Sequence, residues 1–499
     1  MTLSYPSPAP TPTPPPPTAA PARPLPSGTV LTTDPSIQGN VLAGFSKDFA
    51  AFLFLQLQDG PTGQTFLTAL LPLVSANDEV AEFNAAFSSA LQYSGSDPDN
   101  LNATWVGISI TASGLALLSP TASQGLTHPQ ITWDPAITSF LAGAAADTEV
   151  VTPSGPEAPA NWYFGQPAQT VHLVVIIASD SAEDLLGALG EVYQIAARNS
   201  VSLVFQQDGR TLPGARAGHE HFGFKDGISQ PAVQGFVAAD PDGQPLVETG
   251  EFILGYPRHD NPGLVVPLWM FDGSFLVVRR IAQDVPGWWA QAEQLATQLG
   301  LSPETTGAGL VGRWRDGTPT ALDPAGDPRS GPDESSANGF DYSNDLSGQN
   351  TQLFAHIRKV NPRNGSVPGQ DIVGQRRIIR RGIPFGEPFD PALGKDHGPD
   401  AERGLVFACY QASIPAQFSF LQSQWANNSA FPSASAGPDP VIGPQGTCPF
   451  TQTSGTTQIS VTQFVKVEGS VYAFTPSVPC LEALAAGSQL PVFEGDPPL

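Results

Sequence analysis

Two arginines stand side by side in one apolar segment, and a histidine stands in another apolar segment shortly before them. His356 lies in Leu-Phe-Ala-His-Ile, and Arg380 and Arg381 lie in Ile-Ile-Arg-Arg-Gly-Ile-Pro. A neutral imidazole among apolar residues can ligate a haem iron, whereas buried guanidinium groups need an anionic partner. Haem propionates or a developing oxyanion would serve, and so would a carboxylate in a buried ion pair. The residues alone leave these possibilities equal.

A second concentration of unusual residues is Gly218-His-Glu-His-Phe-Gly-Phe-Lys-Asp-Gly-Ile-Ser-Gln-Pro. On a strand, His219 and His221 would face the same way, as a pair of metal ligands does, but no further ligands follow at a recognisable spacing. Solvent-facing or hydrogen-bonded histidines are therefore the default interpretation. Asp226, read alone, is an ordinary turn aspartate.

The three cysteines cannot form a disulfide framework, and none belongs to a CxxC pair. Cys409 lies in the apolar run Gly-Leu-Val-Phe-Ala-Cys-Tyr, which predicts a buried free thiol, while Cys448 and Cys480 are able to pair. Sequons for N-glycosylation, which favour secretion, begin at Asn102, Asn364 and Asn427.

The chain is strongly acidic, with 22 Lys and Arg against 46 Asp and Glu in 499 residues, a formal charge of −24. This charge argues against nucleic acid and against an anionic membrane surface as partners, because both recruit cations. No apolar run reaches the ~18 residues of a spanning helix. Residues 1–28 are rich in proline and contain no apolar signal region, so we expect an extended, disordered tail.

The elements that must position these residues are strands and helices in irregular alternation, which predicts the α+β class. The predicted strands are 52–57, 171–178, 201–205, 252–255, 275–281, 405–410 and 470–474. The predicted helices are 77–93, with Asn77 as N-cap, 181–197, 288–299 and 415–427. The polar stretch 317–349 predicts a long surface loop.

Taken in order, several segments resemble the dye-decolourising peroxidase family, and its fungal branch in particular. They are Ile37-Gln-Gly, Gly223-Phe-Lys-Asp-Gly-Ile-Ser-Gln-Pro, Val311-Gly-Arg-Trp-Arg, Ala355-His-Ile-Arg-Lys, Arg380-Arg-Gly-Ile-Pro-Phe-Gly and Gly404-Leu-Val-Phe-Ala-Cys-Tyr-Gln. The resemblance covers about residues 37–475. It implies two ferredoxin-like domains with antiparallel sheets, residues 29–235 and 236–499, with one b-type haem in the second domain.

The resemblance also implies a role for each residue of the haem site. His356 is the implied proximal ligand of the iron, and Asp439 is the implied acceptor for its other ring nitrogen. Asp226 is the implied distal acid and base, and Arg380 is its implied partner in stabilising the cleavage of the O–O bond.

Further residues take implied places around the cofactor and at the surface. Leu405 and Phe407 alternate on one strand and would narrow the peroxide channel, and Gly227 and Ile228 follow the distal aspartate beside the haem. Trp425 resembles a surface electron-transfer position, although a half-buried packing tryptophan is an equal alternative. Phe385 stands where some fungal relatives have a tyrosine, which puts one relay route in doubt.

The implied function is a secreted, monomeric peroxidase that reduces hydrogen peroxide and oxidises dyes and phenolic donors. Because an aspartate stays basic in mild acid, we expect an acidic pH optimum. The first alternative is a haem-binding or haem-handling protein with little turnover, which would need neither Asp226 nor Arg380. The second is a secreted glycoprotein with a non-haem metal at His219 and His221.

Overall fold

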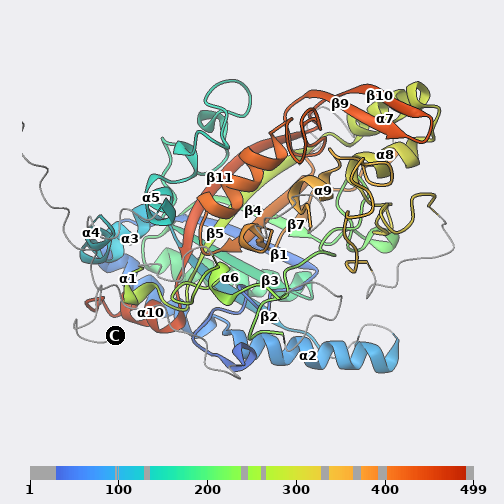
Figure 1. The fold of residues 1–499 in the computed structure, drawn as a ribbon. Helices are drawn as coiled ribbons and strands as arrows, with labels where there is room; N and C mark the ends of the chain where they lie inside the picture. Colours follow the sequence, from blue (N-terminus) through green and yellow to red (C-terminus); the bar gives the residue numbers. More distant parts are fainter. Residues whose placement is uncertain are drawn as a thin grey trace, which may run out of the picture.

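The computed structural model describes residues 30–95, 98, 101–127, 135–237, 246–259, 266–326, 337–363, 373–391 and 402–490 (Figure 1). The predicted tail of residues 1–28, the sequon at Asn364, and His128 and His397 lie outside these ranges. Within them, no helix is long and apolar enough to cross a membrane.

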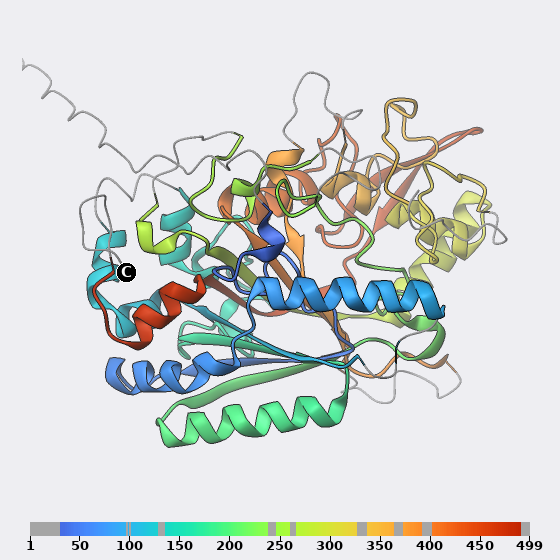
Figure 2. The same ribbon diagram turned by 90° about the horizontal axis from the view of Figure 1, so that it is seen from below.

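The N-terminal half is a ferredoxin-like unit of four antiparallel strands in the order β4-β1-β3-β2. The strands are β1 (Phe49–Gln56), β2 (Thr104–Ile110), β3 (Leu173–Ser179) and β4 (Ser202–Arg210). The helices are α1 (Gly60–Leu70), α2 (Asn77–Ser94), α3 (Ala112–Leu118), α4 (Pro120–Leu126), α5 (Pro135–Ala142) and α6 (Ala182–Arg198). Figure 2 shows α2 and α6 as the two long helices of this half.

The C-terminal half repeats this order. Its strands lie in the order β11-β5-β8-β6, which is fourth, first, third and second in this half. Its strands are β5 (Ser274–Gln283), β6 (Ile379–Arg380), β7 (Ile383–Phe385), which also pairs with β8 (Gly404–Gln411), and β11 (Val465–Thr475). The helices are α7 (Val285–Leu299), α8 (Pro303–Val311), α9 (His356–Val360) and α10 (Val478–Ala485), and β9 (Gly446–Gln452) and β10 (Gly455–Val461) form a separate ribbon. The predicted pair of ferredoxin-like sheets is thereby confirmed.

The two sheets are joined into one and curl toward a barrel. Ile110 of β2 pairs with Phe474 of β11. At the other end β4 packs against β7, where a Cβ on Gly209 would lie 2.4 Å from the Cγ2 of Ile383. The predicted boundary between residues 235 and 236 lies beside residues 238–245, which are not described, and stays a prediction.

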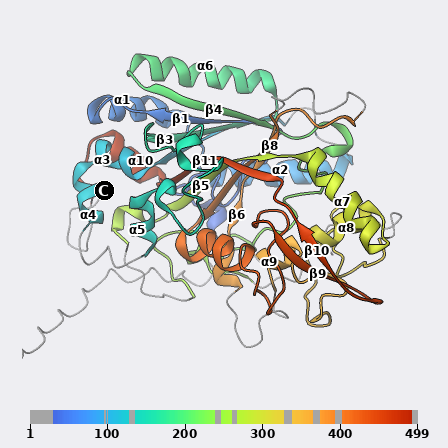
Figure 3. The same ribbon diagram turned by 90° about the horizontal axis from the view of Figure 1, so that it is seen from above.

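Alternate residues of the strands point to two different cores, which explains why the strands read as unbroken apolar runs. Phe52, Phe54 and Val406 belong to the interior of the barrel. Leu53 and Cys409 belong to a second core on the outer face, which helices cover. Figure 3 shows α1 and α6 outside one part of the sheet, with α9 and the β9–β10 ribbon on the opposite side.

Four expectations from the sequence need correction or completion. Residues 252–255 form turns rather than a strand, and they follow a 3-10 turn at 249–251. Ala76 rather than Asn77 is the N-cap of α2, because the Asn77 side chain is buried and donates to the Leu31 carbonyl oxygen at 2.7 Å. Residues 415–426 are helical but wound as two π-helices, Pro415–Ser419 and Leu421–Ala426. All three cysteines are free and buried, so Cys448 and Cys480 do not pair.

The interior core predicts a large cost for Phe54→Ala. Phe54 is 0 % exposed and stacks on Phe164, so we expect the free energy of unfolding to fall by about 3–5 kcal/mol. Denaturant unfolding followed by tryptophan fluorescence measures this change. Leu186→Ala is the control, because Leu186 is 68 % exposed and should change stability by less than about 0.5 kcal/mol.

Candidate active site

Asp226 lies at the end of a closed loop whose geometry fixes its carboxylate. The Asp226 backbone N–H donates to the Gly218 carbonyl oxygen at 2.9 Å, and the Gly227 N–H donates to Asp226 Oδ1 at 2.6 Å. Gly227 has a φ of +80°, a conformation that a side chain disfavours. The turn interpretation of Asp226 is thus correct for its backbone, but its carboxylate also has a distant partner.

That partner is Arg380 on β6, whose Nη1 donates to Asp226 Oδ1 at 2.6 Å. The side-chain amide of Gln230 binds the backbone N–H and carbonyl oxygen of Arg380, at 3.1 and 2.9 Å. Gln230 therefore ties the loop of residues 218–230, called the distal loop below, to β6. Burial opposes ionisation of Asp226, but the charge and hydrogen bond of Arg380, the Gly227 N–H and His356 together hold its pKa below the usual value.

His356 begins α9, and its Nδ1 is 2.8 Å from Asp439 Oδ2. Asp439 is 0 % exposed, and its Oδ1 accepts from the Val441 and Ile442 N–H groups at 2.8 and 3.1 Å. Burial alone would lower the pKa of His356, but the charge and hydrogen bond of Asp439 outweigh it and raise that pKa. With a proton on Nδ1, Nε2 is the ring nitrogen whose lone pair can bind a metal ion.

The two pairs lie close enough for their charges to interact. The charges of Asp226 and Arg380 act on His356, and that of His356 acts on Asp226. The side chains of His356, Arg380 and Asp226 keep 28 %, 29 % and 37 % of their surface accessible, so each presents polar atoms outside the packed core. An imidazole backed by a carboxylate is a donor that fits a haem iron, and the arginine–aspartate pair lies near it.

Leu405 and Phe407 lie on the face of β8 that carries this site. Residues opposite each other in an antiparallel pair point to the same face, and Arg380 is opposite Cys409. Phe407 and Leu405 are two and four residues from Cys409 in the strand, so they share its face, and both are half-buried. Val406 between them points into the barrel.

Ile228 lies where the distal loop meets the loop after α8. Its carbonyl oxygen accepts from Asn338 Nδ2 at 2.7 Å. A Cβ on Gly317 would lie 2.4 Å from Ile228 Cδ1, so Gly317 admits this side chain. Ile228 and Gly227 are thus held beside Asp226 and Arg380.

Trp425 is not at the surface, and the expected surface position is wrong. The side chain is 2 % exposed and stacks on Phe431 with the ring centroids 5.0 Å apart, while Phe420 meets it edge-on. The π-helical turn that carries Trp425 points its ring inward, under the segment that leads to Asp439. The structure therefore matches the packing alternative in kind, but the ring is fully buried rather than half-buried.

His219 and His221 do not act as a pair. His219 Nδ1 lies 2.9 Å from the Ala217 carbonyl oxygen, and the buried His221 Nε2 lies 2.8 Å from that of Phe385. In the part of the chain that the structure describes, no group of three or more His, Cys, Asp or Glu side chains is placed to hold a metal ion. Glu220 between them organises the distal loop, since its carboxylate accepts from Phe222 N, Phe224 N and Gln283 Nε2.

The two adjacent arginines have different partners. Arg380 forms the ion pair with Asp226, whereas Arg381 donates to the carbonyl oxygens of Asn40, Val41 and Leu42. Arg381 is therefore hydrogen-bonded by neutral acceptors, whereas Arg380 has an anionic one.

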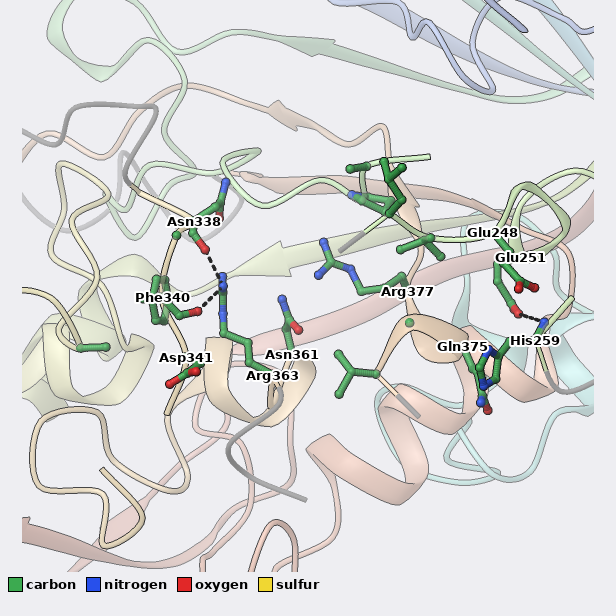
Figure 4. A pocket seen from close by; sticks show the side chains of 18 of the residues that line it. Glu248, Glu251, His259, Asn338, Phe340, Asp341, Asn361, Arg363, Gln375 and Arg377 are labelled. Atoms are coloured by element: carbon green, nitrogen blue, oxygen red, sulfur yellow. Dashed lines mark hydrogen bonds between the residues drawn. The ribbon is translucent and has the colours of Figure 1, made fainter. Parts of the chain in front are cut away.

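Sequence reasoning missed two other arginines, which line a cavity of about 610 Å³ beside the site (Figure 4). Arg363 donates to the carbonyl oxygens of Asn338 and Phe340 at 2.6 and 2.7 Å. Burial, together with the charges of Arg363 and Arg380, lowers the pKa of Arg377 to about 9. The concentration of arginines between residues 358 and 381, in a chain of charge −24, was the available signal.

Two family models match the chain: "DyP dimeric alpha+beta barrel domain" over residues 36–213 and "Dyp-type peroxidase, C-terminal" over residues 265–432. A dye-decolorizing peroxidase of Auricularia auricula-judae is 32 % identical over 484 residues, which cover 91 % of this chain and 88 % of the relative. A multifunctional dye peroxidase of an Amycolatopsis species is 31 % identical over 489 residues, with 92 % and 97 % covered.

Solved structures agree. A point mutant of the dye-decolorizing peroxidase of Pleurotus ostreatus matches with a TM-score of 0.78 and 29 % identity, covering 91 % of this chain and 99 % of that one. A dye-decolorizing peroxidase in complex with 2,6-dimethoxyphenol matches with a TM-score of 0.73 and 31 % identity, covering 90 % and 98 %.

Fold, site and relatives together define the class of protein, a haem-dependent peroxidase. More narrowly, the chain belongs to the dye-decolourising peroxidase family, which confirms the resemblance seen in its motifs.

The buried His221 predicts a pH-dependent stability. Burial lowers the pKa of His221 to about 4, below the ordinary value near 6.5. Between these values the unfolded chain takes up a proton and the folded chain does not, so stability falls as the pH falls, by up to about 1.4 kcal/mol per pH unit. His221→Gln should flatten the free energy of unfolding across this window, measured by denaturant titration at several pH values. His219→Gln controls for loss of an imidazole, and an unchanged slope in His221→Gln would contradict the assignment.

Proposed function

We propose that this peroxidase activates hydrogen peroxide between Asp226 and Arg380 on one side and His356 on the other, and that it oxidises dyes and phenolic donors by one-electron steps. The observation that carries the proposal is that two ion-paired clusters, Asp226–Arg380 and His356–Asp439, lie close enough for their charges to interact, while the side chains of His356, Arg380 and Asp226 stay partly accessible. A haem-handling protein with little turnover would need the second cluster but not the first.

His356 and Asp439 would hold the haem iron from the proximal side, with Asp439 fixing the tautomer and strengthening donation from Nε2. Arg363 and Arg377 would hold the haem carboxylates, because both guanidinium groups line the neighbouring cavity and carry buried positive charge. When bound, the haem would store the two oxidising equivalents that peroxide delivers, and donors would then discharge them one electron at a time.

Asp226 would accept a proton from hydrogen peroxide and return it to the departing oxygen, as a general base and then a general acid. Its lowered pKa keeps it a carboxylate at rest. Arg380 would stabilise the negative charge that develops as the O–O bond breaks. Both groups are held in place beforehand by the Gly227 N–H and by the amide of Gln230.

Leu405 and Phe407 would narrow the approach to this space, since they are half-buried on the face of β8 that carries Arg380. Gly227 and Ile228 would border the same space from the distal loop. Bulky dyes would then react at a distance. A relay through Trp425 stays a proposal, and it needs a further step from this buried ring to the surface.

The donor class follows from the relatives, which include dye-decolorizing peroxidases and one complexed with 2,6-dimethoxyphenol. We further propose a secreted, monomeric glycoprotein. The exposed Asn102 suits a glycan, whereas Asn427 is half-buried and accepts from Gln422 Nε2 at 2.9 Å.

The role of Asp226 predicts the effect of Asp226→Asn. An amide cannot accept the peroxide proton, so the rate constant for the reaction with hydrogen peroxide should fall by about 10²–10⁴-fold. Stopped-flow absorbance of the haem-loaded protein measures it. Asp316→Asn, in an exposed turn, is the matched control, and an equal rate in Asp226→Asn would refute the proposed base.

The lowered pKa of Asp226 predicts an acidic pH optimum. Because Arg380 helps to hold this pKa down, Arg380→Leu should raise it, and the acid limb of the pH–rate profile should move to higher pH. Steady-state oxidation of a phenolic donor between pH 2.5 and 8 measures both effects. An optimum near neutrality in the native protein would count against Asp226.

A further inference from the structure

Lys359 is a buried cation next to the proximal pair that the proposed chemistry does not use. It lies on α9 three residues after His356, so the two side chains leave the same side of the helix. Lys359 is 0 % exposed. The neighbouring Arg358 is anchored elsewhere, to Asp345 and the Thr351 carbonyl oxygen.

The ammonium of Lys359 is satisfied by backbone alone. Its Nζ donates to the carbonyl oxygens of Asn428, Phe431 and Gly437 at 2.7, 2.7 and 2.8 Å. An ammonium has three N–H donors, so all of them are used. All three acceptors lie in one segment, 428–437, which runs directly into Pro438 and Asp439.

Asp439 is the buried negative charge that faces this ammonium. Neutral carbonyls do not balance a buried cation, and burial lowers the pKa of Lys359 to about 8 while the charge of Asp439 acts to raise it. Asp439 is itself 0 % exposed and hydrogen-bonded to His356. The two opposite charges lie in one dry region, where each reduces the cost of burying the other.

We propose that Lys359 is a positioning residue for the proximal pair: it clamps segment 428–437 to α9 and so keeps Asp439 within hydrogen-bond reach of His356. The inference rests on the proposed role of His356 and Asp439. In this proposal Lys359 contacts neither haem nor substrate. The effect of Lys359 on the iron runs through Asp439.

The test compares Lys359→Met, Asp439→Asn and the double variant. In the haem-free protein, hydrogen exchange of residues 428–437 should accelerate by roughly tenfold or more in Lys359→Met, because each hydrogen bond to a charged group is worth about that factor. Lys47→Met, which removes a buried ammonium paired with Asp180 in the N-terminal half, should leave exchange in this segment unchanged.

In the haem-loaded proteins, the iron reduction potential is the second measurement. Asp439→Asn should make it more positive, since His356 then donates less strongly. Lys359→Met should shift it in the same direction, and the double variant should show little beyond Asp439→Asn, because both changes act on one hydrogen bond. Lys359→Gln, which keeps an N–H donor without the charge, should shift the potential less and serves if Lys359→Met fails to fold.

The outcomes separate the inference from the proposed function. If Asp439→Asn leaves the potential unchanged, the proposed proximal pair is wrong, and the role of Lys359 falls with it. If Asp439→Asn shifts the potential but Lys359→Met does not, or if the two shifts add in the double variant, only the inference about Lys359 is wrong.

Discussion

A carboxylate with no access to water is the constraint on which the site depends. Asp439 is 0 % exposed, and a buried charge is tolerated only with hydrogen bonds and compensating charge. His356 Nδ1 and the N–H groups of Val441 and Ile442 supply the hydrogen bonds, and Lys359 supplies the opposite charge. Because these partners hold Nδ1 of His356, Nε2 is the ring nitrogen left for a ligand, and His356 lies close enough to Asp226 and Arg380 for the charges to interact.

The register of the sheet does the rest of the positioning. The pairing of Arg380 with Cys409 puts the arginine on the same face as Leu405 and Phe407, and a shift of β6 by one residue would turn Arg380 toward the barrel interior. That interior is filled by large apolar side chains, including Phe52 and Phe54. The duplicated fold thus uses one face of its strands for stability, and the C-terminal half uses part of the other face for chemistry (Figure 3).

The sequence predicted those features that repeat at short range or belong to ordered motifs. Strands buried on both faces, such as Leu173–Ser179, read as continuous apolar runs. The implied pairing of His356 with Asp439 stands at hydrogen-bond distance, although 83 residues separate them. Long-range packing was beyond the sequence. The burial of Trp425 depends on Phe431 folding over it, and the different partners of Arg380 and Arg381 lie on loops far away in the sequence.

The measurement that tests the central claim most directly is the absorption spectrum of His356→Ala, with and without added imidazole, before and after one equivalent of hydrogen peroxide. The claim is that His356 Nε2 is the protein ligand of the haem iron, backed by Asp439. It predicts a weakened or shifted Soret band in the variant, no normal response to peroxide, and recovery of both when imidazole fills the place of the lost side chain. An unaltered Soret band and an unaltered peroxide response in His356→Ala would contradict the account.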